Sequence, residues 1–306
     1  MRRKLISLSL IFNFVLWTTA LKLHSIEFRN PSISSTASPT HPPVILIHGL
    51  LGNSRNFATI ANELVLSLAT PRKVFAFDLR NHGVSPHSPT MSYTELAGDV
   101  IETMDSIGLQ NAVLIGHSLG GKVAMAASLL NPTRVAGLIV LDMAPKSYSS
   151  TSDVAQSLDA IIETCVSLSL DSCTSKREFS QQLSLSGVDD QNLRAFISTN
   201  VKKVGEKFVW STNIKAIQEG LSEIHGFFPF VGEEYNRIYA GDCYFIAGEN
   251  SNYVTVDDMK QIKTLYEHHM LTKVKGSGHW VHADAPDRVT SLIRQYLDRC
   301  LHLVSI

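Results

Sequence analysis

Short apolar runs alternate with amphipathic stretches over the first half of the chain. Four runs rich in β-branched and other apolar residues predict buried parallel strands, at 44–47, 74–77, 112–115 and 138–141. Apolar residues at helical spacing predict helices between them, at 56–68, 93–107 and 119–130. Ser92 with Glu95 forms a capping-box pattern for the second of these helices, and Asn131-Pro132 ends the third. This alternation predicts an α/β fold, with a mostly parallel sheet covered by helices on both faces.

The pattern changes after residue 145. No apolar strand is evident between 146 and 240, and only helical patches appear, at 154–168, 176–185 and 192–201. The α/β pattern then resumes with two strands and two helices, at 243–247, 257–268, 271–275 and 286–301. We therefore expect one α/β core formed by residues 44–145 and 241–306, carrying a helical cap formed by residues 146–240.

The start of the chain reads as a targeting segment, residues 1–21, followed by a leader, residues 22–43. Basic residues at positions 2–4 precede an uncharged apolar stretch, as in a secretory signal peptide. The first acidic residue is Glu27, and an acid-poor basic start also suits a mitochondrial presequence. No Asn lies in an Asn-x-Ser/Thr glycosylation site, which is weak evidence against secretion.

Composition narrows the classes of function. The chain has 306 residues, of which 44% are hydrophobic and 18% charged, with a formal net charge of -1. These values suit a folded protein with a sizeable core and give no field that would attract nucleic acid. The four cysteines fit no zinc motif and are expected as buried thiols, with one or two disulfides as the alternative. Phosphate-loop, dinucleotide and zinc-protease motifs are lacking, so we expect no cofactor and no metal.

The segment Gly116-His-Ser-Leu-Gly120 matches the G-x-S-x-G motif in the context that the motif requires. It follows an apolar strand and opens a helix, so the glycines permit a tight turn that exposes the Ser118 hydroxyl. We predict that Ser118 is a nucleophile in an α/β-hydrolase fold. The alternative is a serine in an ordinary strand–helix turn.

Backbone donors for a developing oxyanion are expected beside this serine. The residue after the nucleophile supplies one amide in this fold, here Leu119. The loop His48-Gly-Leu-Leu-Gly52 follows the first core strand, and its Leu50 amide is the expected second donor.

The general base is predicted to be His279, in Gly278-His-Trp280 after the last strand. It lies late in the chain, as the order Ser, acid, His of this fold demands. His282 is the neighbouring rival, but Gly276 and Gly278 free the loop of His279.

The acid of the triad is less evident. Counting three residues from Gly248, where an Asp is usual, leads to Ser251. Asp142 ends the strand that should neighbour the nucleophile strand, and it is the preferred candidate. Glu249 is an alternative, and so is the pair Asp257 and Asp258. Asp78 and Arg80 are expected to brace loops, and His82 to be structural.

Three stretches resemble the abhydrolase domain-containing protein eleven family and related bacterial esterases. They are Asp78-Leu-Arg-Asn-His-Gly-Val-Ser-Pro-His87, Gly116-His-Ser-Leu-Gly-Gly-Lys122 and Gly278-His-Trp-Val-His-Ala-Asp284, and the resemblance covers about residues 42 to 303. The resemblance implies an esterase or lipase-like activity, no metal or organic cofactor, and a mitochondrial setting in animals. It also implies an acid after the strand that follows the nucleophile helix, which corresponds to Asp142.

These observations predict hydrolysis of acyl esters through an acyl-enzyme. The aromatic residues Phe227, Phe228 and Phe230, at the end of the cap, are expected to line the pocket for a hydrophobic acyl group. A thioesterase is the near alternative, because the same triad cleaves both bonds. A protein that keeps the fold and protects or scaffolds a partner enzyme is an alternative from another class.

Overall fold

The computed structural model describes residues 20–31, 41–227 and 237–299. A seven-stranded sheet lies at the centre, in the order β1-β3-β2-β4-β5-β8-β9. Its strands are β1 (Ser25–Phe28), β2 (Val44–Ile47), β3 (Val74–Phe77), β4 (Ala112–His117), β5 (Val135–Leu141), β8 (Tyr239–Gly248) and β9 (Tyr266–Val274). All neighbouring strands are parallel except β1, which pairs antiparallel with β3. The predicted α/β fold is confirmed.

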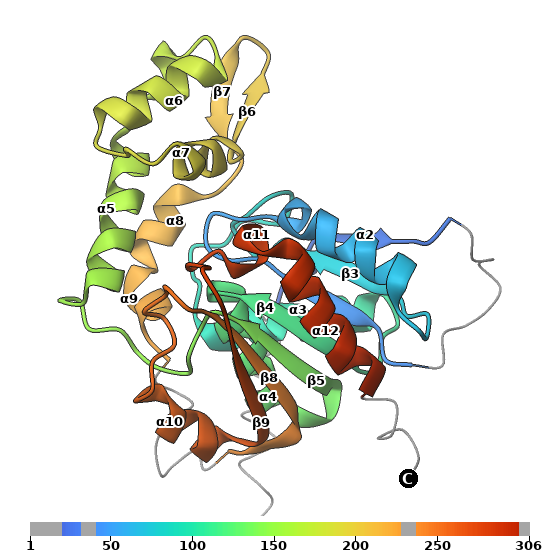
Figure 1. The fold of residues 1–306 in the computed structure, drawn as a ribbon. Coiled ribbons are helices and arrows are strands. Elements are labelled where there is room, and N and C mark those ends of the chain that lie inside the picture. Colours follow the sequence, from blue (N-terminus) through green and yellow to red (C-terminus); the bar gives the residue numbers. More distant parts are fainter. Residues whose placement is uncertain (1–19, 32–40, 228–236, 300–306) are drawn as a thin grey trace, which may run out of the picture.

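Helices cover both faces of the sheet (Figure 1). One face packs against α2 (Ala58–Ser67) and α12 (Pro286–Arg299), with the short α11 (Val281–Asp284) nearby. The other face packs against α3 (Tyr93–Ser106), α4 (Leu119–Leu130) and α10 (Asp258–Leu265). Short 3-10 turns complete the framework: η2 (Ser54–Phe57), η3 (Pro132–Arg134) and η4 (Leu170–Ser172).

The central strands are apolar throughout because each face of the sheet is buried. In β2, Ile45 and Ile47 pack in the cluster on the α3–α4 face, whereas Val44 and Leu46 pack in the cluster on the α2–α12 face. Successive side chains of a strand point to opposite faces, so a strand buried on both sides has no polar position.

The cap rises from the carboxyl-terminal end of β5 and stands above the sheet (Figure 1). Its helices are α5 (Asp153–Ser167), α6 (Lys176–Leu185), α7 (Gln191–Ser198), α8 (Ile214–Glu219) and α9 (Leu221–His225). The expectation of helices alone was wrong, because β6 (Val201–Val204) and β7 (Lys207–Trp210) form an antiparallel hairpin. Each strand has only four residues, and β6 contains two lysines and β7 one, so neither forms the apolar run that marks a buried strand.

The segment expected to be a leader contributes to the core. Strand β1 lies at the edge of the sheet, and the Leu23 side chain is buried. The Leu23 amide donates to Thr103 Oγ1 at 2.8 Å, and the Leu21 amide donates to Asp99 Oδ1 at 2.6 Å. Four half-buried residues at a sheet edge give little hydrophobic signal, which explains why the sequence did not reveal this strand.

Most of the expected targeting segment, residues 1–19, lies outside the described residues. Within the described ranges, no helix is long and apolar enough to cross a membrane.

A buried ion pair joins the loop after β3 to α3. The Arg80 guanidinium donates to both carboxylate oxygens of Asp99, at 2.6 and 2.8 Å, and both side chains are fully buried. Arg80 also pairs with Glu95 at 2.9 Å. Asp78 accepts the amides of Ser54 and Val84. Asp78 and Arg80 therefore brace loops, as the sequence predicted.

Asp99→Ala is expected to lower the free energy of unfolding by about 3–5 kcal/mol, because it leaves the buried Arg80 charge without its bidentate partner. Urea denaturation of the full chain measures this loss. The matched control is Asp105→Ala, which removes a more exposed pair with Arg134 and is expected to cost at most about 1 kcal/mol. Equal losses in the two variants would contradict this account.

Candidate active site

Ser118 lies in the tight turn between β4 and α4. Its backbone has a positive φ of 53° with ψ of -118°, a conformation that L-residues rarely adopt. Glycine is required on both sides of it. A Cβ at Gly116 would overlap the carbonyl of Gly120, and a Cβ at Gly120 would overlap the carbonyl of Ile47. The turn therefore holds the Ser118 hydroxyl above the sheet, as the G-x-S-x-G pattern predicts.

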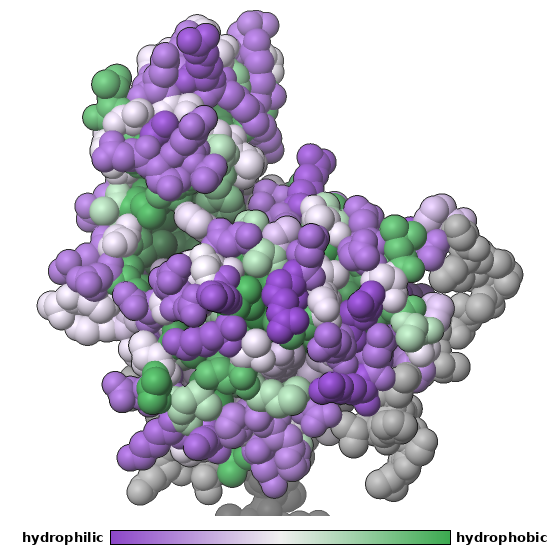
Figure 2. All heavy atoms as spheres, in the orientation of Figure 1, coloured by the Kyte–Doolittle hydropathy of each residue, from purple (hydrophilic) through white to green (hydrophobic). Residues whose placement is uncertain are grey.

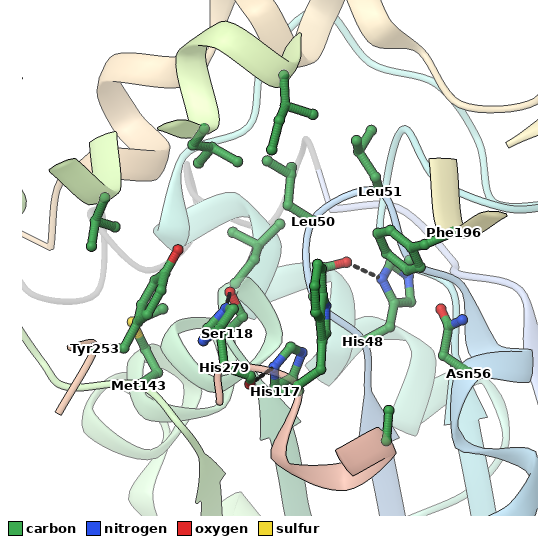
Figure 3. A pocket seen from close by; sticks show the side chains of 18 of the residues that line it. His48, Leu50, Leu51, Asn56, His117, Ser118, Met143, Phe196, Tyr253 and His279 are labelled. Atoms are coloured by element: carbon green, nitrogen blue, oxygen red, sulfur yellow. Dashed lines mark hydrogen bonds between the residues drawn. The ribbon is translucent and has the colours of Figure 1, made fainter. Parts of the chain in front are cut away.

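His279 connects Ser118 to Asp142. Its Nε2 lies 3.0 Å from Ser118 Oγ, and its Nδ1 lies 2.7 Å from Asp142 Oδ2. Asp142 directly follows β5, the neighbour of β4, and His279 lies in the loop after β9. Figure 3 shows Ser118 and His279 facing each other in the cavity. The structure thus brings together the three residues that the sequence singled out.

Asp142 is fully buried and is held by donors on its oxygens. The Gly248 amide donates to Oδ1 at 2.9 Å, and the Ser251 hydroxyl donates to Oδ2. These hydrogen bonds fix the orientation of the carboxylate toward His279. Ser251 stands at the position where an Asp is usual, and its hydroxyl binds Asp142.

Tyr253 is a contact of the base that sequence reasoning missed. Its ring is stacked on the His279 ring, with the centroids 3.6 Å apart and the planes 13° from parallel. Its amide donates to Ser251 Oγ at 3.2 Å. The only sequence signal for this contact was the Ser251 position, where an Asp is usual.

The alternative acids lie elsewhere. Glu249 accepts the Gly276 amide at 2.9 Å, and Asp258 pairs with Lys146 at 2.7 Å. Asp257 precedes α10 and has no described bond to His279. Among the described carboxylates, Asp142 alone binds the imidazole of His279.

His282, the alternative base, lines the same cavity as Ser118 but forms no hydrogen bond with it. Its ring is stacked on Phe57, with centroids 5.1 Å apart, and lies 4.3 Å from the His117 ring centroid. Burial and the neighbouring His279 lower the pKa of His282 to about 4. The imidazole is therefore neutral at physiological pH.

The backbone amides of Leu50 and Leu119 have no acceptor among the described residues. Leu119 is the first residue of α4, so its amide has no acceptor within the helix. Both residues line the same cavity as Ser118, as the donors of an oxyanion hole must.

Two buried neutral imidazoles hold the Leu50 loop. His82 Nε2 accepts the Leu51 amide at 3.2 Å, and His48 Nε2 accepts the Leu79 amide at 2.9 Å. Their Nδ1 atoms lie within hydrogen-bond distance of the carbonyls of Arg80 and Gly49, which assigns the proton to Nδ1 in each ring. Burial lowers the pKa of both rings, and that of His82 to about 3. The structural role expected for His82 is thus the positioning of this loop.

A cavity of about 750 Å³ lies between the cap and the core. Figure 2 shows apolar side chains in the hollow beneath the cap. Apolar and aromatic side chains from both parts line it, among them Leu50, Met143, Leu158, Ile161, Leu193 and Phe196.

Phe227, expected to line this pocket, is fully buried behind Tyr93, with ring centroids 5.9 Å apart. It is not among the lining residues. Phe228 and Phe230 lie outside the described residues.

The described residues contain no group of three or more His, Cys, Asp or Glu side chains that could hold a metal. The cysteines Cys165, Cys173 and Cys243 are buried free thiols, as expected. Cys300 lies outside the described residues.

Comparison with known proteins identifies the family. Residues 42–286 match the family model described as the alpha/beta hydrolase fold. The chain is 34% identical over 252 residues to the sn-1-specific diacylglycerol lipase ABHD11 of Danio rerio, covering 82% of this chain and 77% of that protein. It is 31% identical to the esterase YbfF of Escherichia coli (strain K12), covering 87% of this chain and 97% of that protein.

A solved structure has the same architecture. The marine microorganism esterase superposes with a TM-score of 0.82 at 30% identity, covering 90% of this chain and all of that one. The chain therefore belongs to the α/β-hydrolase family, among relatives named as esterases and lipases.

Proposed function

We propose that this chain is a serine esterase or lipase that cleaves carboxylic esters of hydrophobic acyl groups through Ser118, His279 and Asp142. One observation carries the proposal: hydrogen bonds link Ser118, His279 and Asp142 beside an apolar cavity that is also lined by Leu50 and Leu119, whose amides donate to no described residue. The family and the relatives named as esterases and lipases support an ester-cleaving hydrolase.

The geometry supports a two-step acyl transfer. In the first step, Ser118 Oγ attacks the ester carbonyl while His279 Nε2 takes its proton, and the Leu50 and Leu119 amides bind the oxyanion. The same proton then passes to the departing alcohol, which leaves an acyl-enzyme. In the second step, water attacks the acyl-enzyme with His279 again as base, and the carboxylic acid is released. Asp142 orients the imidazole and stabilises its cationic form.

The acyl group is proposed to occupy the cavity between the cap and the nucleophile helix. Leu158 and Ile161 of α5 reach the cavity from the cap side, and Met143 reaches it from the core side. Transfer of each methylene from water into such a site contributes about 0.8 kcal/mol, so esters with longer chains should bind more tightly until the cavity is filled.

An oxygen ester and a thioester of the same acyl group test the proposal against a thioesterase. The full chain should hydrolyse p-nitrophenyl esters with a higher kcat/KM than the matching acyl-CoA. A higher kcat/KM for the acyl-CoA would favour the thioesterase. No hydrolysis of either substrate by the folded protein would favour the alternative in which the fold protects or scaffolds a partner enzyme.

A mitochondrial location is the remaining proposal, supported by the basic, acid-poor start of the chain and by the similarity to ABHD11 proteins. Fractionation of cells that express the full chain should recover it with mitochondria. Recovery in the secretory pathway would instead identify the start as a signal peptide.

A further inference from the structure

The side chain of Lys122 is buried in the wall of the cavity, one helical turn after Ser118. Its Nζ lies 2.9 Å from the carbonyl oxygen of Gly226 and 3.3 Å from each of the carbonyl oxygens of Ile224 and His225. An ammonium has three N–H donors, and these three carbonyls match them. Lys122 thus directs its hydrogen bonds to a single segment, residues 224–226, at the end of the last cap helix, α9.

Two tyrosines complete the enclosure of this ammonium. The ring centroids of Tyr148 and Tyr93 lie 4.8 and 5.5 Å from Nζ, within the range of a cation–π interaction. The Tyr93 hydroxyl donates to the carbonyl of Ile224 at 2.7 Å, and the Tyr148 amide donates to the carbonyl of His225 at 2.9 Å. Lys122, Tyr93 and Tyr148 line the cavity, and so do Ile224 and His225 of the segment they hold, whereas Gly226 does not. The segment is therefore part of the wall that a bound acyl group would meet.

The charge of Lys122 is compensated by dipoles and rings and not by an acid, since it forms no ion pair with a described carboxylate. The titratable groups of the elements around it are Tyr93, Lys146, Tyr148, Asp159, Glu223, His225 and Asp258. Among these, His225 pairs with Asp159 at 2.6 Å and Lys146 pairs with Asp258 at 2.7 Å. Burial raises the pKa of Tyr93 and Tyr148, so both stay neutral.

We propose that Lys122 is a positioning residue, which holds segment 224–226 against the nucleophile helix and so sets the length of acyl chain that the cavity accepts. This inference rests on the proposed esterase function. The protonated side chain offers three donors and a positive charge, whereas the neutral amine offers two donors and no charge. Charge-assisted hydrogen bonds are about twice as strong as neutral ones, so loss of the proton should loosen the wall.

Burial and the nearby Lys146 ammonium lower the pKa of Lys122 to about 7. Lys122 should therefore hold segment 224–226 more tightly below this pH than above it. This pKa lies near neutral pH, so ester turnover can be measured on both sides of it.

The test is the ratio of kcat/KM for dodecanoyl and butyryl p-nitrophenyl esters, measured across the pH range around 7. Both esters would be cleaved by the same residues, so the pH dependence of the chemical steps cancels in the ratio. In the wild type, the ratio should rise as the pH passes through about 7. In Lys122→Met, it should be independent of pH and about tenfold above the low-pH wild-type value, the factor expected for one charge-assisted hydrogen bond.

Lys146→Met is the matched variant, because it removes a neighbouring lysine that does not contact segment 224–226. It should leave the size of the pH transition unchanged and move its midpoint to higher pH, since the repulsion that lowers the pKa of Lys122 is gone. If Lys122 had only a structural role, the ratio of kcat/KM values would have no pH transition whose midpoint Lys146→Met could move. If Lys122→Met does not fold, this shift still tests the proposal in a chain that retains Lys122.

Amide hydrogen exchange of residues 221–227 gives a readout that does not depend on activity. Exchange at a fixed pH should be faster in Lys122→Met than in the wild type. The inference is overturned if Lys122→Met keeps the wild-type ratio and exchange, or if Lys146→Met leaves the midpoint in place. If the wild type cleaves no ester, the proposed function fails, and the exchange comparison still decides whether Lys122 holds the segment.

Discussion

Ser118→Ala is expected to abolish ester turnover, with a loss in kcat on the order of 10⁶, because the chain then has no nucleophile for the acyl-enzyme. Labelling of the protein by a fluorophosphonate should vanish as well, since the reagent bonds to the activated hydroxyl. The fold should persist. Alanine keeps the Cβ and the backbone strain of the turn, and the lost hydroxyl contacts only His279 among the described residues.

Ser128→Ala is the control for this experiment. Ser128 is a buried serine on the same helix, and its hydroxyl donates to the carbonyl of Met125 at 2.8 Å. This variant should retain wild-type labelling and turnover. Persistent turnover in Ser118→Ala would remove the proposed nucleophile, whereas loss of both activities in Ser128→Ala would point to an unspecific effect on α4.

Asp142→Asn is expected to lower kcat by about 10⁴ while the protein stays folded. The substitution keeps the shape of the side chain and removes the charge that stabilises the imidazolium of His279. It also introduces an amide NH₂ into a pocket where the Gly248 amide, the Ser251 hydroxyl and His279 Nδ1 already point hydrogen atoms at the carboxylate. As a result, either the His279 imidazole carries its proton on Nε2 instead of Nδ1, or one of the three donors loses its acceptor.

Steady-state kinetics of Asp142→Asn should be compared with Glu249→Gln and Asp257→Asn. These two remove the charge of carboxylates that the sequence left as alternatives and that do not contact the base in the structure. Both should retain activity close to that of the wild type. A collapse of turnover in Glu249→Gln, with normal turnover in Asp142→Asn, would reverse the assignment of the acid.

The fold class, and the residues Ser118 and His279, could be predicted from the sequence because their signals are local. A strand buried on both faces must be apolar at every position, and a helix that covers it must be apolar at every third or fourth. The tight turn at Ser118 needs glycines at fixed offsets, and a loop histidine late in the chain follows from the order of the triad. These requirements act within a few residues, so the sequence displays them.

The remaining features depend on contacts between distant residues. Asp142 and His279 are 137 positions apart, and which of the four candidate carboxylates contacts His279 depends on the position of β5 beside β4. The edge strand β1 and the hairpin β6–β7 carry weak patterns because their stability comes from pairing and not from full burial. Likewise, nothing in the local sequence shows that Lys122 meets carbonyls about a hundred residues away.

By itself, the sequence indicated an α/β fold, a serine in a tight turn after the third predicted strand, and a loop histidine late in the chain, because periodicity and turn chemistry are properties of neighbouring residues. Only the tertiary structure decided that Asp142 is the carboxylate beside the base, that Ser251 and Tyr253 hold this pair, and that Phe227 lies behind the cavity wall. Each of these depends on the order of strands in the sheet and on how the cap returns to the core, which short-range patterns do not encode.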